Sequence, residues 1–260
     1  MSGIVLVFDD LMNELIAIIL SFIKRKGSNW LHVLLVCKRW YALGKKVFDP
    51  SVDHNLAIRM ASKYGDLNLA KELLKDPRVD PSAIDNWAIG WACENGHLQV
   101  VQELLKDPRV NPSSGDNHAV KWASEKGHFQ VVRELLKDPR VDPSHNDNWA
   151  IRKASHHGHS QVVQELLKDP RVDPSVYENI IIRQASECGH LQIVQEVMKH
   201  SKVDPSSYDN WAIRMASVNG HSQVVQELLK DSRVIALNQQ RFKCRKRKYS
   251  DSHSVNYYSS

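Results

Sequence analysis

The sequence predicts an all-α solenoid of stacked helix-turn-helix units, because it repeats itself at a constant interval. The stretch ELLKDPRVDPS begins at Glu72 and returns unchanged at Glu134 and Glu165, with a near copy at Glu103. One glycine and one asparagine recur every 31 residues; they are Gly65, Gly96, Gly127, Gly158, Gly189 and Gly220, and Asn55, Asn86, Asn117, Asn148, Asn179 and Asn210. Copies at a fixed period are typical of a repeat protein in which each unit packs on its neighbours.

Each unit is expected to contain two short helices. Most copies open with Asp or Glu followed by Asn, which we interpret as helix-capping residues, and an apolar-periodic segment such as WAIRKAS follows. The glycine ends this first helix in a left-handed conformation. The second segment, HSQVVQELLK, places Val162, Val163 and Leu166 on one face. Asp-Pro-Arg ends it, and VDPS turns the chain toward the next unit.

The stretch WAIRKASHHGHSQVVQELLKDPRVDPS resembles an ankyrin repeat in its Ala-Ser, Gly-His and Val-Val pairs. The resemblance covers roughly residues 48–237, and the unit of 31 residues is shorter than the family's usual length of about 33. It implies an ankyrin-like helix-turn-helix solenoid that binds other proteins. We therefore predict a domain of six ankyrin-like repeats at residues 49–238.

The segment before the repeats does not share their pattern. The apolar residues of ELIAIILSFI follow helical spacing, and a second apolar cluster runs from Val33 to Trp40. Two or three short amphipathic helices are expected, separated by a polar turn at residues 24–29. One interpretation is a cap for the solenoid, although the segment is unusually apolar for a cap.

The same segment resembles an F-box, most specifically in VCKRW at Val36 to Trp40. The resemblance implies a small three-helix F-box-like module at residues 1–48, which docks on the linker subunit of a cullin-RING ubiquitin ligase. Met12 stands where the family usually has proline. The residues matched to the family's apolar face and core are Leu11, Leu15, Ile19, Phe22, Val36 and Trp40.

The copies differ from one another after the Ala-Ser pair and in the turns. In ankyrin-like arrays these offsets face the concave groove, so they either carry target specificity or vary because nothing constrains them. Aromatic residues and Arg dominate interface energetics. The candidate target-binding residues are Tyr64, Trp91, Trp122, Arg152, His156, His157, Tyr177, Arg183, Tyr208 and Arg214. For Trp91 and Trp122 the alternative is that they shield the seam between repeats.

No catalytic, cofactor or metal site is expected, because the sequence has no glycine-rich phosphate loop, nucleophile elbow or HExxH motif. A histidine follows the repeated glycine at His97, His128, His159, His190 and His221. Packed helices lie roughly 8–10 Å apart, whereas each zinc ligand must approach the ion within about 2 Å. These histidines are therefore predicted to bond to neighbouring backbone, and the protein is predicted to be non-enzymatic.

Charge is concentrated near the C-terminus. The chain of 260 residues has a formal net charge of +5, and six basic residues and one acidic residue lie between Arg241 and Asp251. The remaining 29 basic and 29 acidic residues cancel, which argues against nucleic-acid binding by the body of the protein. Residues 239–260 form a basic, Ser- and Tyr-rich tail that we expect to be disordered, and its run 243–248 is either a nuclear address or a solvated tail.

Four scattered cysteines without a CxxC pair favour a reduced, intracellular compartment, cytoplasmic or nuclear. The apolar run Leu15 to Ile23 is too short to span a membrane and follows an acidic leader, so neither a membrane span nor an export signal is expected. The sequence thus predicts an adaptor that holds a target protein on its repeats and a ligase subunit on its N-terminal module, and that is a monomer outside this complex. The alternative is a plain scaffold or competitive binder whose N-terminal helices only cap the array.

Overall fold

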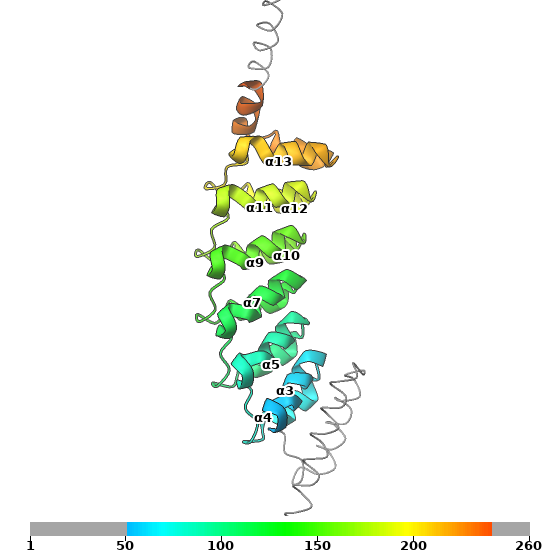
Figure 1. Cartoon of the computed structure of the whole chain (residues 1–260), viewed down its shortest axis with the longest axis vertical. Helices are drawn as coiled ribbons and strands as arrows, with labels where there is room; N and C mark the ends of the chain where they lie inside the picture. The colour runs from blue at the N-terminus through cyan, green and yellow to red at the C-terminus, as the bar shows by residue number, and fades with distance from the viewer. Residues whose placement is uncertain (1–50, 241–260) are drawn as a thin grey trace, which may run out of the picture. The chain divides into compact units, whose positions relative to one another are not determined.

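The computed structural model describes residues 51–240. The predicted F-box-like module at 1–48 lies outside these residues, as does the predicted tail except for its first two residues. Within the described part every regular element is a helix, and there is no strand (Figure 1). The chain divides between Asp142 and Pro143 into two compact units, each described below by itself.

The first unit contains three helix pairs, which are α3 (Val52–Tyr64) with α4 (Leu67–Leu74), α5 (Ala83–Glu94) with α6 (Leu98–Leu104), and α7 (Ser114–Lys126) with α8 (Phe129–Leu135). The first helix of each pair packs on the first helix of the next, so α3 contacts α5 and α5 contacts α7. The second helices form a parallel layer in the same way, from α4 through α6 to α8.

The second unit repeats this arrangement with α9 (His145–His156) and α10 (Ser160–Leu166), α11 (Val176–Glu187) and α12 (Leu191–Val197), and α13 (Ser207–Val218) and α14 (Ser222–Leu228). Its first helices pack in the order α9, α11, α13, and α12 lies between α10 and α14. Residues 232–240 form a further helical segment. The prediction of an all-α solenoid of ankyrin-like helix pairs is confirmed for the part of the chain that the structure describes.

The core of each pair follows the apolar positions of the repeat. On α5 the small residues Ala88 and Ala92 are fully buried, which lets neighbouring helices approach closely. On α6 the larger Val100, Val101 and Leu104 are at most 1% exposed. Burying a side chain of this size contributes about 1.5–3 kcal/mol, so most of the stability of a short helix comes from the helices beside it.

The repeated Asp-Pro-Arg sequence forms a compact ion-paired turn after each second helix in which it is present. Asp169 accepts bonds from the backbone N–H of Arg171 and from its guanidinium, at 3.0 and 2.6 Å. The bonds from Arg171 lower the pKa of Asp169. The recurring Asp-Pro-Arg residues therefore stabilise this turn, which explains why ELLKDPRVDPS recurs with so few changes.

Each first helix is entered through one left-handed turn. In α5 the residues Ile84, Asp85 and Asn86 have φ angles of 53, 50 and 61°, and corresponding residues in the other repeats are similar. A left-handed residue costs about 1–2 kcal/mol, except that Gly, Asn and Asp tolerate this region best. The Asp-Asn pair is therefore selected by backbone conformation. The interpretation of this pair as helix caps is wrong, since the flanking residue is Ser82 and it makes no side-chain cap bond.

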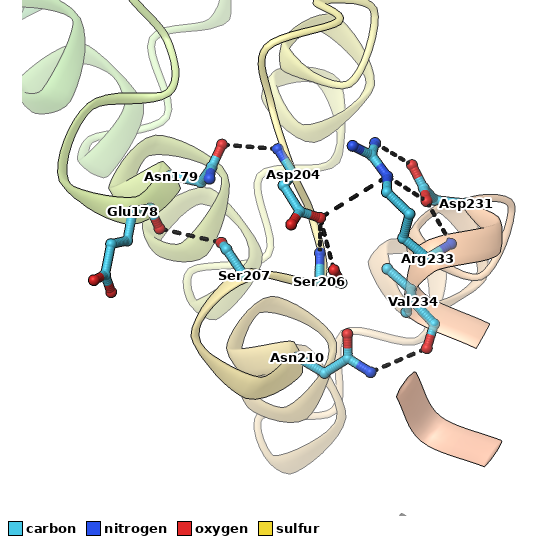
Figure 2. Close-up of polar contacts among 9 residues, drawn as sticks. All are labelled: Glu178, Asn179, Asp204, Ser206, Ser207, Asn210, Asp231, Arg233 and Val234. Atoms are coloured by element: carbon cyan, nitrogen blue, oxygen red, sulfur yellow. Dashed lines mark hydrogen bonds and ion pairs between the residues drawn. The ribbon is translucent and has the colours of Figure 1, made fainter. Parts of the chain in front are cut away.

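The buried asparagine at the end of this turn ties each repeat to the next. The Oδ1 atom of Asn179 accepts the backbone N–H of Asp204 at 2.9 Å, 25 residues further along the chain (Figure 2). The same bond forms from Asn148 to Asp173, also at 2.9 Å. In the first unit the pairs are Asn55 with Asp80, Asn86 with Asn111 and Asn117 with Asp142. A side chain buried in one repeat thus fixes the turn of the following one.

Asn210, in the last pair, makes a different set of bonds. Its Nδ2 atom donates to the carbonyl of Val234 at 3.0 Å (Figure 2). The same atom donates to Oδ1 of Asn238, also at 3.0 Å. The residue is completely buried, and its Oδ1 has no partner within the described chain. In the other repeats the asparagine Oδ1 accepts a backbone N–H from the following VDPS or VNPS turn. After the last pair the helical segment 232–240 follows instead of such a turn, and Asn210 donates through Nδ2 to this segment.

The left-handed turn gives a direct stability prediction at Ile84, a β-branched residue with φ of 53° and a side chain that is 40% exposed. The same repeat position holds Gly115 and Asn146, both of which suit a positive φ. We expect Ile84→Asn to raise the free energy of unfolding by about 1 kcal/mol, measured by chemical denaturation. The control Ile84→Val keeps the β-branch and should give no gain; equal midpoints for the two variants would contradict the explanation.

Candidate partner-binding surface

The second unit carries an alternating row of arginines and tyrosines along its first helices. The row comprises Arg152 on α9, Tyr177 and Arg183 on α11, and Tyr208 and Arg214 on α13, and we call it the Arg–Tyr row. The guanidinium carbon of Arg152 lies 5.1 Å from the centre of the Tyr177 ring. That of Arg183 lies 4.6 Å from the centre of the Tyr208 ring. Arg152 and Arg183 therefore each stack on a tyrosine of the next repeat, whereas Arg214 lies over Trp211 of its own helix.

The left-handed turn explains how the tyrosines reach these arginines. Tyr177 and Tyr208 are the first of the three left-handed residues in α11 and α13, with φ of 47 and 54°. The turn carries their rings outward, and they are 53% and 55% exposed. A right-handed start to the helix would direct the side chain differently. The strained backbone is thus what exposes two aromatic rings at this surface.

Hydrogen bonds hold the row in one conformation. Arg183 donates from Nη2 to the carbonyl of Tyr177 at 3.1 Å, and Tyr177 donates its hydroxyl to Asp147 at 2.5 Å. The bond to Asp147 raises the pKa of the Tyr177 hydroxyl, with smaller contributions from burial and from the charge of that carboxylate. Arg214 makes longer contacts of 3.4 Å to the carbonyl and carboxylate of Asp209. Only part of each guanidinium's set of N–H donors is used in these contacts.

A hollow of about 220 Å³ adjoins the row at Arg152. It is lined by Trp149, Arg152, Lys153, His156 and Gln184, and none of these five residues is acidic. Two polar atoms of these residues, Nε of Arg152 and Oε1 of Gln184, are buried and have no hydrogen-bond partner within the described chain. The hollow therefore combines positive charge with an unused donor.

The structure brings six of the ten candidate target-binding residues together. Five form the Arg–Tyr row, and the sixth, His156, lines the adjoining hollow. His157 follows at the end of α9, where its ring lies 5.1 Å from that of His156 and 6.0 Å from that of His159. Whether these residues bind a partner remains a prediction.

The other three candidates lie in the first unit. Trp91 is half-buried under Arg59 and Lys63, whose charged groups lie 5.7 and 5.2 Å from its ring. Tyr64, at the end of α3, also faces Lys63, at 5.8 Å.

Trp122 stacks on His118 at 4.7 Å and packs so closely on α5 that a Cβ atom at Gly90 would lie 3.0 Å from its ring. Burial and the charge of Lys121 lower the pKa of His118. The packing of Trp122 across two repeats fits the alternative of seam shielding.

Sequence reasoning missed several residues beside the row. Trp211 lies edge-on to Tyr208 at 5.8 Å and beneath Arg214 at 5.7 Å. Lys153 lies over Trp149 at 5.5 Å, and both line the hollow with Gln184. Trp149 and Trp211 occupy the same position of the repeat. Trp149 and Lys153 are four residues apart on one helix, and this spacing predicts that their side chains are in contact.

The repeated histidines support the stacking of repeats. In the second unit Nε2 of His190 lies 3.1 Å from the carbonyl of His156, and that of His221 lies 3.0 Å from the carbonyl of Glu187. His97 and His128 make equivalent contacts in the first unit. The prediction of backbone-bonded turn histidines is confirmed for these four. Across residues 51–240 no group of His, Cys, Asp or Glu side chains is arranged to hold a metal ion.

No helix within residues 51–240 has both the length and the apolar character that are needed to cross a bilayer.

Comparisons with known proteins give a consistent result. A family model described as ankyrin repeats in three copies matches residues 58–147 and again 150–240. Among solved structures, the crystal structure of the human ASB11 ankyrin repeat domain is similar, with a TM-score of 0.55 and 16% sequence identity over 66% of this chain and 82% of that chain. At this identity the likeness concerns the fold alone. No curated protein sequence matches the chain.

Proposed function

Since this chain belongs to the ankyrin-repeat family, we propose that it is a non-catalytic protein-interaction adaptor, which holds a target protein on its repeats and delivers it to a ubiquitin ligase. The first part follows from the family, since ankyrin repeats form protein–protein interaction scaffolds. The observation that carries target binding is the Arg–Tyr row. It presents exposed aromatic rings and fixed guanidinium groups on a rigid helical layer, and such residues dominate binding energy at protein interfaces.

The contrast between the two sides of the repeat supports this proposal. The second helices are similar from copy to copy, with Lys–Glu pairs such as Lys168 with Glu165 and Lys199 with Glu196, and four of the six turns after them read Asp-Pro-Arg. The first helices differ from copy to copy at the tyrosine positions of the row and at the hollow, although the arginine recurs as Arg152, Arg183 and Arg214. A scaffold whose second helices are similar, and whose first helices vary in sequence on one surface, is suited to recognising a particular partner.

The delivery step rests on the sequence of residues 1–48, which lies outside the described structure. VCKRW and the apolar helical spacing before it resemble an F-box, the module that docks on the linker subunit of cullin-RING ligases. An apolar face of this kind is suited to insertion into a partner's groove. The adaptor would then act by raising the effective concentration of transferable ubiquitin at the bound target, while other subunits supply the chemistry.

Two substitutions in the full chain test the delivery step. Leu15→Asp and Trp40→Ala are each expected to abolish capture of purified linker subunit in a pull-down, because they disrupt the apolar face and the core of the module. The matched control is Val218→Asp, which places the same charge at a residue of the array that is 76% exposed. This control should retain capture. Thermal unfolding of each variant, followed by circular dichroism, should show that the array of helix pairs remains folded.

The alternative is an ankyrin-type scaffold or competitive binder with no ligase connection. In that case neither the full chain nor a chain beginning at Asp49 would capture the linker subunit, and residues 1–48 would serve only as a cap. Retention of capture by Leu15→Asp and Trp40→Ala would also remove the F-box interpretation. Capture by the full chain and not by the shorter chain is the expected result.

A further inference from the structure

We propose that the Arg–Tyr row and the adjoining hollow bind an acidic, extended segment of the partner in which a carboxylate recurs at every third residue. This inference rests on the proposed function and names the kind of target that the second unit accepts. It depends on three observations: the charge of the hollow, the spacing of the arginines, and the exposure of the tyrosines between them.

The hollow is built to receive one carboxylate. Arg152 and Lys153 supply positive charge, and none of the five lining residues is acidic. The buried Nε of Arg152 has no partner within the described chain, while its Nη2 makes only a 3.5 Å contact to the carbonyl of Asn146. A carboxylate matches the planar fork of a guanidinium with two parallel hydrogen bonds. Such a carboxylate would need to displace no existing ion pair.

The arginines recur at the spacing of packed helices. Arg152, Arg183 and Arg214 occupy the same position on α9, α11 and α13, which pack side by side in this order. Packed helices lie about 8–10 Å apart. In a polyproline II chain, which has three residues per turn, every third side chain lies on the same face and advances about 9 Å. Acidic residues at i, i+3 and i+6 can therefore meet the three arginines in turn.

The tyrosines provide contacts for the residues between the acidic ones. The rings of Tyr177 and Tyr208 lie between successive arginines and are 53% and 55% exposed. Each ring is already held by the guanidinium stacked on it, so little conformational entropy is lost on binding. Proline or aliphatic residues at the intervening positions would pack on these rings. The row thus favours a peptide with both acidic and apolar residues.

The carboxylates beside the row favour a peptide over a nucleic acid. Asp147 is bonded to Tyr177, and Asp209 contacts Arg214, so negative charge lies next to both ends of the row. A nucleic-acid backbone carries a charge at every phosphate and would meet these carboxylates. A peptide with acidic residues at every third position can place neutral residues there.

Fluorescence anisotropy with the full chain tests the proposal. The probe is a labelled nine-residue peptide with Glu at positions 2, 5 and 8 and Pro, Ala and Ser elsewhere. The comparison peptide has the same composition with its three Glu residues adjacent. We expect the spaced peptide to bind about tenfold more tightly than the clustered one, since only the spaced peptide reaches all three arginines.

Substitutions assign the binding to the row. Arg183→Gln should weaken binding of the spaced peptide about tenfold, and Arg183→Lys should recover only part of the loss because it lacks the guanidinium fork. The matched control is Lys199→Gln, which removes one positive charge from the exposed second-helix side of the same unit. The affinity of Lys199→Gln for the spaced peptide should stay within about twofold of that of the unsubstituted chain. Lys153→Gln provides a second test at the hollow if Arg183→Gln fails to fold, and it should also weaken binding.

Four outcomes would overturn the inference. They are absence of peptide binding, equal affinity for the spaced and clustered peptides, equal effects of Arg183→Gln and Lys199→Gln, and tighter binding of a single-stranded oligonucleotide that displaces the peptide. The linker-subunit pull-down uses different residues, so its success alongside peptide failure would remove this inference alone. Peptide binding without linker capture would remove only the ligase connection.

Discussion

Asn210→Asp is expected to lower the free energy of unfolding by about 3 kcal/mol or more. The amide of Asn210 donates to the carbonyl of Val234 and to Oδ1 of Asn238, both at 3.0 Å, in a completely buried position. A carboxylate there would lose both bonds and face two oxygen acceptors. The side-chain amide of Asn238 can rotate to donate, but the carbonyl of Val234 is fixed by the backbone. Urea denaturation of the full chain, followed by circular dichroism, measures the loss.

Asn179→Asp is the matched control, because the two asparagines occupy the same repeat position with the same left-handed backbone. Asn179 uses its oxygen, which accepts the N–H of Asp204 at 2.9 Å (Figure 2), and an aspartate retains this acceptor. Asn179→Asp should lower the free energy of unfolding by about 1 kcal/mol, mainly because the new charge is desolvated at a residue that is 7% exposed. A larger loss for Asn179→Asp than for Asn210→Asp would refute the assigned bonds.

The second large effect is expected at Gly189, whose substitution by alanine should destabilise the protein by about 2–4 kcal/mol. Gly189 has φ of +78°, and an added Cβ would lie 2.6 Å from Nδ1 of His221. His221 would have to move, which breaks its 3.0 Å contact with the carbonyl of Glu187. The alanine therefore strains its own backbone and also separates two neighbouring repeats.

Gly220→Ala separates these two contributions. Gly220 has nearly the same φ, +76°, but no atom lies within 4 Å of the position of its Cβ. Only the backbone cost of about 1 kcal/mol should remain. Thermal and urea unfolding of both variants give the comparison. If both glycine variants lower the free energy of unfolding by the same amount, the packing of His221 against Gly189 contributes nothing measurable to stability.

The period of the sequence was sufficient to predict the helix pairs and their stacking. Gly65, Gly127 and the other repeated glycines have the predicted left-handed conformation, because a positive φ restricts the choice of residue strongly and so leaves a visible mark in the sequence. The repeated apolar pairs, such as Val162 and Val163, are buried as predicted. These features follow from backbone conformation and from the apolar pattern, both of which can be recognised within one copy of the repeat.

The role of the repeated asparagine could not be derived in the same way. Asp and Asn before a helix suit a capping role and a left-handed turn equally well, since both use a short polar side chain. The contact that distinguishes them joins Asn148 to Asp173 and lies outside the local window. Sequence periodicity identifies such a residue as important without showing what it contacts.

The candidate surface was predicted in part for a similar reason. The arginines and tyrosines of the row were chosen as residue types that favour interfaces, but their alternation in space depends on the left-handed turn that carries Tyr177 and Tyr208 outward. The hollow requires Gln184 of one repeat beside Trp149 and Arg152 of the preceding one. Neither relation appears in any single copy of the repeat.

The asparagine tie also bears on how such a gene can change in length. The partner of each tied asparagine belongs to the following copy, as with Asn148 and Asp173. Unequal recombination that adds or removes one whole copy inside an array therefore restores every tie, because the copies are interchangeable at these two positions. The end of the array is different, since Asn210 is matched to Val234 and Asn238. Growth and loss of copies are thus compatible with folding in the interior, whereas the terminal copy must be inherited together with the helix that follows it.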